Sequence, residues 1–122
     1  MEKPIRIGAF SATFEVPKSM VRYYIQLGLL IPKQVNGQYL FDSQCHSDMR
    51  RIEMWKRMRF SLDEIHQLIS LFRKYPNTVV EQETEYKALV CSKREELIRL
   101  RRQNAVSLQK VQSMLNRLPR DR

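Results

Sequence analysis

The sequence predicts a mainly helical protein in which a short helix-turn-helix and a β-hairpin precede one long C-terminal helix. Three observations support this fold. The 122 residues include only three glycines and five prolines, which favours long helices over many short strands. An Asn36-Gly37 pair is typical of the tight turn of a two-stranded hairpin. Residues 79–117 contain neither glycine nor proline, so they can form one uninterrupted helix.

The composition is that of a folded and strongly basic protein. Apolar residues make up 43% of the chain, and 22 Lys and Arg against 13 Asp and Glu give a net charge of +9. This excess of positive charge indicates a polyanionic partner. No apolar run approaches the ~18 residues of a membrane span, and the N-terminus lacks the apolar core of a signal peptide. With only two distant cysteines, we expect a reduced, cytoplasmic protein that has no membrane partner.

The first two helices are short. Ile7, Phe10 and Phe14 share one face of the first helix. Pro17 suits the first turn of the second helix, and Gly28 is well placed as its C-terminal stop.

The second helix has two chemically different faces. Met20, Val21 and Tyr24 form its apolar face, and residues 29–31 then enter the core. Its opposite face, at steps of three and four residues, consists of Lys18, Ser19, Arg22, Tyr23 and Gln26. A basic and aromatic face beside a hairpin is suited to lie on nucleic acid.

In the hairpin, the aromatic residues Tyr39 and Phe41 occupy alternate positions after the turn, as in a strand. Two further helices follow it. Asp42 or Ser43 can cap the third helix. Its apolar residues are Cys45, Met49, Ile52, Trp55 and Met58.

The start of the fourth helix carries the clearest local signal in the chain. Ser61-Leu62-Asp63-Glu64 predicts a capping box, and Phe60 and Ile65 occupy the positions of a hydrophobic staple. Tyr75-Pro76-Asn77 ends this helix and marks the one clear domain boundary.

The long C-terminal helix has a seven-residue apolar pattern. Its predicted dimerisation residues are Val90, Leu97, Leu100, Asn104, Leu108, Val111, Leu115 and Leu118. An amphipathic helix of this length cannot cover its own apolar stripe, so it needs a partner helix. Asn104 within the stripe can set the register of the pair at some expense of stability.

These elements, in this order, resemble the MerR family of bacterial transcription regulators. The resemblance covers roughly residues 5–73. It rests on Ile7-Gly8, Val16, Arg22-Tyr23-Tyr24, Gly28-Leu29-Leu30, Pro32, Asn36-Gly37 and Phe60-Ser61-Leu62-Asp63-Glu64-Ile65. These motifs are specific in combination. The remainder matches only in kind, as the long helix through which family members form an antiparallel homodimer.

The resemblance implies a winged helix-turn-helix DNA-binding domain over residues 1–75, a coiled-coil dimerisation helix over 78–118 and a basic tail over 119–122. The second helix would enter the major groove of double-stranded DNA while the hairpin, or wing, grips phosphates. The homodimer would bind and distort a pseudo-palindromic operator at a promoter, beside RNA polymerase. Bound to DNA, it would be associated with the nucleoid. The resemblance implies no cofactor, and the sequence names no small-molecule effector.

The residues expected at the DNA lie on the second helix, the wing and the third helix. We expect Lys18 and Ser19 near the bases, Arg22 on a phosphate or guanine edge and Tyr23 on the backbone. The full predicted set is Lys18, Ser19, Arg22, Tyr23, Gln26, Lys33, Gln38, Tyr39 and Arg50 or Arg51.

The chain departs from the family pattern at several positions. Glu15 stands where the family has the glycine of a Thr-Gly pair, so the turn between the first two helices has lost its easy access to positive φ. Arg59 replaces the glycine before Phe60, and Tyr39 stands in place of the usual wing arginine. These substitutions affect the fine geometry at the DNA and leave the predicted fold unchanged.

Other functions fit the residues less well. Adjacent helical residues Cys45 and His46 point about 100° apart, and Cys91 has no second ligand nearby, so no metal site is expected. Cys91 lies close to Lys93, which leaves a thiol-based stress sensor as one alternative. The other is a basic coiled-coil interaction protein that contacts DNA only nonspecifically. No catalytic constellation is present, so we do not expect an enzyme.

Overall fold

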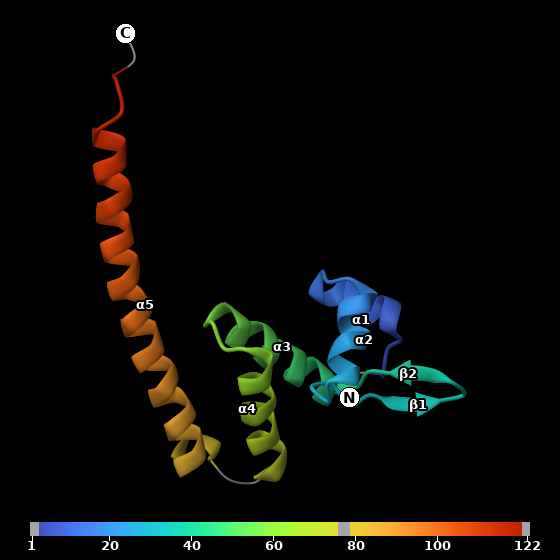
Figure 1. Ribbon diagram of the computed structural model, residues 1–122. Coiled ribbons are helices and arrows are strands. Elements are labelled where there is room, and N and C mark those ends of the chain that lie inside the picture. The colour runs from blue at the N-terminus through green and yellow to red at the C-terminus, as the bar shows by residue number, and fades with distance from the viewer. Residues whose placement is uncertain (1–2, 76–78, 121–122) are drawn as a thin grey trace. The chain divides into compact units, whose positions relative to one another are not determined.

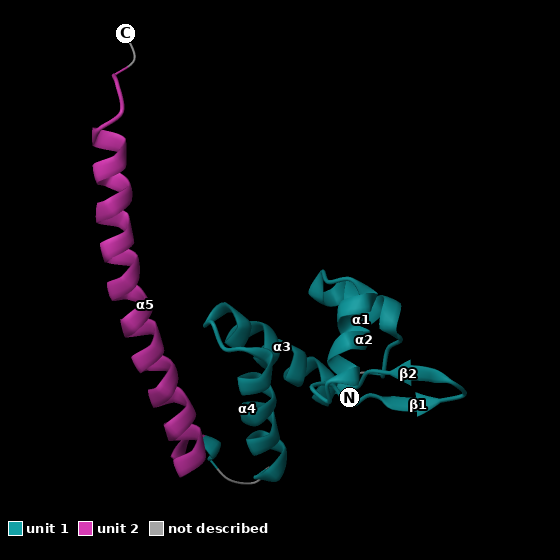
Figure 2. Ribbon diagram, viewed as in Figure 1, with its two compact units in different colours: residues 1–80 teal, residues 81–122 magenta. Residues whose placement is uncertain are grey.

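A computed structural model describes residues 3–75 and 79–120 of the protein. The chain divides into two compact units, residues 1–80 and 81–122 (Figure 2). Within the described residues, helices and a small hairpin make up the first unit, and one long helix dominates the second (Figure 1). This confirms the predicted fold class.

The first helix, α1 (Ile7–Phe14), ends in a left-handed turn that a non-glycine residue adopts. Glu15 has φ 55° and ψ 42°. The Val16 N–H donates to the Ser11 carbonyl at 3.1 Å, which is the long hydrogen bond of a Schellman motif. The turn therefore keeps the conformation that glycine usually provides, although glycine is absent.

The second helix, α2 (Lys18–Gln26), follows after three residues, and Pro17 lies at its N-cap, one position before the predicted first turn. Gly28, with φ 78°, ends the helix as predicted. Here the Leu29 N–H donates to the Tyr24 carbonyl at 2.9 Å, so α2 ends with the same hydrogen-bonded motif as α1.

The hairpin consists of strands β1 (Lys33–Val35) and β2 (Gln38–Leu40), paired antiparallel. Asn36 and Gly37 both have positive φ, 52° and 76°, as a type I′ turn requires. Ile5 and Phe41 exchange backbone hydrogen bonds of 3.0 and 2.7 Å, which attach the N-terminal segment to the base of this wing.

Helices α3 (Ser43–Arg57) and α4 (Leu62–Lys74) complete the first unit, and their starts are capped. The Asp42 carboxylate accepts a hydrogen bond from the Cys45 N–H at 3.0 Å. Ser61 and Glu64 form the predicted capping box, with reciprocal bonds of 3.2 and 2.8 Å. Local signals thus set both helix starts.

A single apolar core lies among these elements. Its largest fully buried side chains are Phe10, Val21, Tyr24, Leu29, Leu30, Phe41, Cys45, Met49, Ile52, Ile65, Leu68 and Ile69. The Phe10 and Phe41 rings stack at 4.2 Å, which joins α1 to the wing. The core therefore holds the helix-turn-helix and the wing in one arrangement.

Two predicted core residues are exposed instead. Ile31 is 65% exposed, whereas Leu29 and Leu30 before it are buried. Met58 is 49% exposed at the C-cap of α3, because 100° per residue turns this position away from the face that buries Met49 and Ile52.

The long helix, α5, spans Thr84–Asn116 and is preceded by a short 3-10 turn, Val80–Gln82. It begins later than the predicted start at residue 78, which lies outside the described residues. Its 33 residues correspond to a length of about 50 Å. None of the helices described is long and apolar enough to cross a membrane.

Candidate nucleic-acid interface

The exposed face of α2 carries the residues that the sequence assigned to DNA. These residues, all classed as exposed, are Lys18, Ser19, Arg22, Tyr23 and Gln26. Val21 and Tyr24 on the opposite face are 0% and 2% exposed. The helix thus presents its basic and aromatic face to solvent and packs its apolar face on the core.

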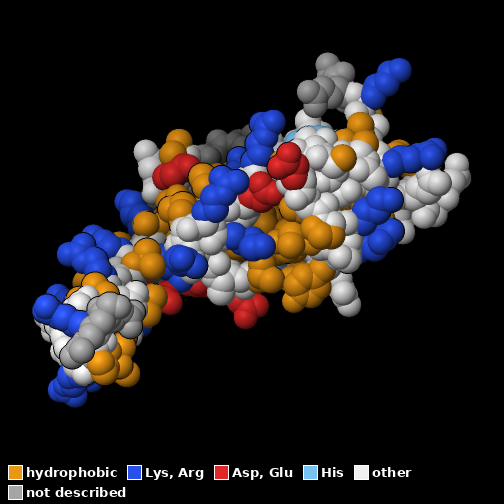
Figure 3. Space-filling view, turned by 90° about the horizontal axis from the view of Figure 1, so that it is seen from above, with side chains coloured by type: hydrophobic (Ala, Val, Ile, Leu, Met, Phe, Trp, Pro, Cys, Tyr) orange, Lys and Arg blue, Asp and Glu red, His pale blue; other side chains and the backbone are white. Residues whose placement is uncertain are grey.

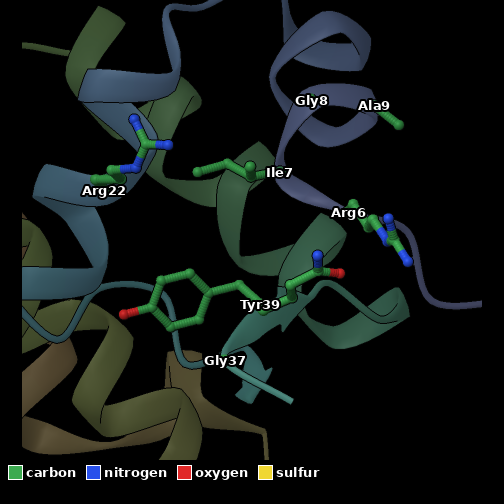
Figure 4. A pocket seen from close by; sticks show the side chains of 8 residues that line it. Arg6, Ile7, Gly8, Ala9, Arg22, Gly37 and Tyr39 are labelled. Carbon is green, nitrogen blue, oxygen red and sulfur yellow. The ribbon is translucent and has the colours of Figure 1, made fainter. Parts of the chain in front are cut away.

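A groove of about 480 Å³ lies beside this face, between the start of α1, the middle of α2 and the tip of the wing. Its lining residues are Arg6, Ile7, Gly8, Ala9, Arg22, Gly37, Gln38 and Tyr39. In Figure 4, Arg22, Ile7 and Tyr39 surround the groove, and Arg6 lies beyond them at the start of α1. The groove therefore combines three segments that are distant in the sequence.

The groove has the electrostatics of an anion site. Among the described residues, no side chain forms a cap hydrogen bond at the N-terminus of α1, where the first backbone N–H groups of a helix attract anions. A Cβ added at Gly8 would lie 3.7 Å from Lys18 Nζ, so the Lys18 ammonium lies close to this helix turn. Together with Arg6 and Arg22, it places three cations around the groove.

Arg6 was missed in the sequence analysis. It precedes the first apolar residue of α1 and so carries no periodic signal. One clue was available, because a basic residue occupies the N-cap position, where Ser, Thr, Asp or Asn is usual.

The predicted wing residues lie on both strands of the hairpin. Lys33 at the start of β1 and Gln38 at the start of β2 are exposed. Tyr39 is half-buried, and its ring lies 6.4 Å from that of Phe41. In the space-filling view, Lys and Arg side chains clearly outnumber acidic ones on the face shown (Figure 3).

The two neighbouring arginines of α3 differ in their surroundings. Arg50 is exposed. The Arg51 guanidinium lies 4.4 Å from the centre of the Phe72 ring and 3.7 Å from Asp48 Oδ1. Arg51 therefore has partners within the fold, and Arg50 is the more exposed of the two predicted candidates.

A polar network that the sequence did not indicate supports the end of α2. Asp48 is only 3% exposed and accepts a hydrogen bond from Gln44 at 3.0 Å. Arg73 approaches Asp48 Oδ2 at 3.4 Å and donates to the carbonyls of Gly28 and Leu29, each at 2.7 Å. These residues lie far apart in the sequence, so periodicity could not reveal the network.

A second contact holds the middle of α2. Lys56 Nζ donates a hydrogen bond to the buried Tyr24 hydroxyl at 2.8 Å. The sequence analysis placed Tyr24 in the core, and the structure confirms that position. The exposed face of α2 is thus presented on a helix that side-chain contacts secure at two points.

The two thiols have different environments. Burial raises the pKa of the Cys45 thiol to about 11, so this thiol is neutral near pH 7. Cys91 on α5 is exposed. Within the described part of the chain, no group of three His, Cys, Asp or Glu residues could hold a metal ion.

The predicted dimerisation residues form an exposed stripe on α5 of the single chain. The exposed fractions of its apolar residues are 40% for Val90, 37% for Leu97, 40% for Leu100, 67% for Leu108, 51% for Val111, 55% for Leu115 and 61% for Leu118. Asn104 is exposed as well. Leu118 lies beyond the last residue of α5, in the turn that follows it.

Comparison with known proteins identifies the fold. A lead(II)-bound transcription regulator from Ralstonia metallidurans CH34, PbrR691, superposes with a TM-score of 0.77 at 21% identity, covering 97% of this chain and 90% of its own. The structure of EcmrR, taken from the EcmrR–DNA complex in EcmrR-RPo, has a TM-score of 0.72 at 22% identity. The match covers 92% of this chain and 38% of the EcmrR chain. The structure of a putative MerR family transcriptional regulator from Listeria monocytogenes has a TM-score of 0.67 at 20% identity. The match covers 92% of this chain and 83% of the Listeria chain.

The sequence itself identifies the family. No curated protein sequence matches the chain. The family model for MerR HTH family regulatory proteins matches residues 5–71, which is more than half of the chain and contains α1 to the end region of α4. This match confirms the resemblance seen in the motifs. Members of the MerR family are regulators of transcription and not enzymes. The chain belongs to the MerR family of transcription regulators.

Proposed function

We propose that this protein is a homodimeric, sequence-specific regulator that binds double-stranded DNA through the exposed face of α2. One observation carries the proposal. The exposed face of α2 adjoins a groove in which Arg6, Lys18 and Arg22 surround the uncapped start of α1. A helix face of suitable chemistry thus lies beside a site suited to a backbone phosphate, and sequence-specific binding needs both.

The groove suits a DNA phosphate in particular. Backbone N–H groups at a helix start and arginine guanidiniums are donors well suited to phosphate oxygens. The wing lines the groove partly with Gly37, which has no side chain to obstruct the sugar–phosphate backbone. With a phosphate held there, Lys18 and Ser19 at the start of α2 would meet base edges in the major groove.

Dimerisation through α5 is supported by its apolar stripe and by its charge distribution. Residues 81–96 contain five glutamates against three basic residues, a net charge of −2. Residues 97–120 contain six Lys and Arg and no acidic residue, a net charge of +6. Two copies paired antiparallel would place the acidic part of one helix beside the basic part of the other, whereas parallel copies would align like charges.

We further propose that the dimer acts at a promoter, by distorting a pseudo-palindromic operator and working with RNA polymerase. The structural likeness to EcmrR, which was captured in a DNA complex within EcmrR-RPo, supports this step. A protein with this role would work in the cytoplasm. The thiol-sensor alternative rests on Cys91 alone, a free and exposed thiol on α5.

The proposal can be tested by selecting bound duplexes from a random DNA pool at near-physiological salt. We expect enrichment of an inverted repeat that binds at least ~10³-fold more tightly than random duplex. A pool without enrichment would favour the basic interaction protein that contacts DNA nonspecifically.

Arg6→Ala and Arg22→Ala then test the interface itself. If Arg6 contacts a phosphate in each protomer, Arg6→Ala should weaken binding to operator and random duplex alike. It should also reduce the magnitude of the salt slope by about 0.9 per protomer, or about 1.8 for the dimer. Arg22→Ala should weaken operator binding in the same assay. Lys87→Ala, an exposed position on α5, is the matched loss of one charge. Affinities for both arginine variants equal to that of Lys87→Ala would place the interface elsewhere.

A further inference from the structure

We propose that Arg73 is a positioning residue that sets the orientation of α2 for DNA recognition, an inference that rests on the function proposed above. Its guanidinium joins three segments. Nη1 donates to the Gly28 carbonyl and Nη2 to the Leu29 carbonyl, both at 2.7 Å, and Nη2 also lies 3.4 Å from Asp48 Oδ2. The last turn of α4 is thereby tied to the end of α2 and to α3.

The contact acts at the C-terminal end of a short helix, α2. α2 has only nine residues and no side-chain cap at its start, so its own hydrogen bonds do little to set its direction. The carbonyls of Gly28 and Leu29 belong to the turn that ends the helix, where partial negative charge attracts a cation. A guanidinium suits this position because its planar fork can serve two carbonyls and a carboxylate at once.

Burial distinguishes this network from a surface ion pair. The Asp48 side chain is 4% exposed and that of Arg73 is 28% exposed. An exposed pair such as Arg57 with Glu53, whose arginine side chain is 80% exposed, is screened by water and contributes little. Arg73 also reaches carbonyls that are 44 and 45 residues away in the sequence, so it fixes tertiary geometry and not merely local helix structure.

Arg51 offers a matched control because it shares one partner with Arg73 but not the others. It pairs with Asp48 at 3.7 Å and lies over Phe72, and the contacts shown for it do not include α2. Loss of Arg51 should therefore weaken the fold around Asp48 and leave the end of α2 in place. A merely structural role for Arg73 would make the two variants behave alike.

The experiment compares Arg73→Lys with Arg51→Lys in the full-length protein, at a temperature where both are folded. Lysine keeps the charge, but it lacks the planar fork whose two separate nitrogens serve the two carbonyls in the wild type. We expect Arg73→Lys to lower the ratio of operator to random-duplex affinity about tenfold, equivalent to about 1.4 kcal/mol. Affinity for random duplex, which phosphate contacts set, should change less than twofold. Arg51→Lys should leave the ratio within twofold of the wild type.

Hydrogen exchange provides a readout that does not depend on DNA. Amide protons of residues 28–30 should exchange faster in Arg73→Lys than in the wild type, and at the wild-type rate in Arg51→Lys. If Arg73→Lys does not fold, Arg73→Gln, which retains a neutral donor, replaces it in both measurements.

The outcomes separate this inference from the proposed function. A wild-type protein with no operator preference would refute the proposed function, and hydrogen exchange would still decide whether Arg73 secures the end of α2. A wild-type operator preference that Arg73→Lys and Arg51→Lys reduce equally would overturn the positioning role and leave the proposed function standing. Hydrogen exchange at residues 28–30 that is no faster in Arg73→Lys than in the wild type would also overturn the positioning role.

Discussion

Replacing Glu15 with glycine should stabilise the protein, although it removes a side chain. Glu15 has φ 55° in the turn between α1 and α2, a region of backbone conformation that residues other than glycine rarely adopt. Its side chain is exposed, so the substitution loses no apolar burial. The hydrogen bonds of the turn come from the backbone and would remain.

The expected gain follows from two opposing contributions. The left-handed conformation costs an L-residue about 1–2 kcal/mol relative to the right-handed one. Glycine offsets part of this relief, because the extra freedom of the unfolded chain lowers stability by about 0.4–1 kcal/mol. The net expectation is a stabilisation of about 0.8 kcal/mol, which raises the melting temperature of a unit of this size by about 4 °C.

Thermal unfolding followed by circular dichroism, at one protein concentration, measures this change. Glu15→Ala is the control, because it removes the carboxylate from the helix C-terminus but keeps the Cβ that causes the strain. Gly28→Ala is the reciprocal test, since Gly28 has φ 78° and an added Cβ would lie 3.4 Å from His66 Nε2. If Glu15→Gly is no more stable than Glu15→Ala, the reasoning about strain at this turn is wrong.

Two further predictions concern ionisable groups at the start of α3. The hydrogen bond from the Cys45 N–H, with attraction from Lys33, lowers the pKa of Asp42 from its usual 3.8. The ionised Asp42 carboxylate should therefore stabilise the protein above pH 4, and this stabilisation should disappear as the pH falls through the lowered pKa of the folded state. Asp42→Asn can still cap α3 but cannot titrate, so thermal melts between pH 3 and 7 should show a shallower acid loss, and parallel curves would contradict this. Because burial raises the pKa of Cys45 to about 11, iodoacetamide at pH 7.5 should leave this thiol unmodified in the native protein and alkylate it in denaturant, as mass spectrometry would show. Native alkylation of Cys45 would refute its burial.

The sequence was sufficient wherever the signal lies within a few consecutive residues. The capping box at Ser61, the Asn36-Gly37 turn and the glycine stop of α2 are hydrogen-bonded motifs whose partners are at most five positions apart, and each occurs where the residues indicated. The division of α2 into a buried and an exposed face follows from helical periodicity alone. The exposed α2 residues of the candidate site were therefore foreseeable.

Residues whose surroundings come from distant segments were not foreseeable. Arg51 follows Arg50 directly, and its contact with the Phe72 ring exists only because α4 packs beside α3. Arg6 joins the candidate site only because the wing and α2 converge on the start of α1.

The sequence by itself thus determined the order of the elements, their capping motifs, their amphipathic faces and the family. Only the tertiary structure decided that Glu15 and Arg59 take positive φ, 55° and 72°, where glycine is the usual choice. It also brought Arg73 to the end of α2. The physical reason is common to these cases: local propensity disfavours or ignores such arrangements, and the burial of one shared core outweighs a local strain of about 1–3 kcal/mol.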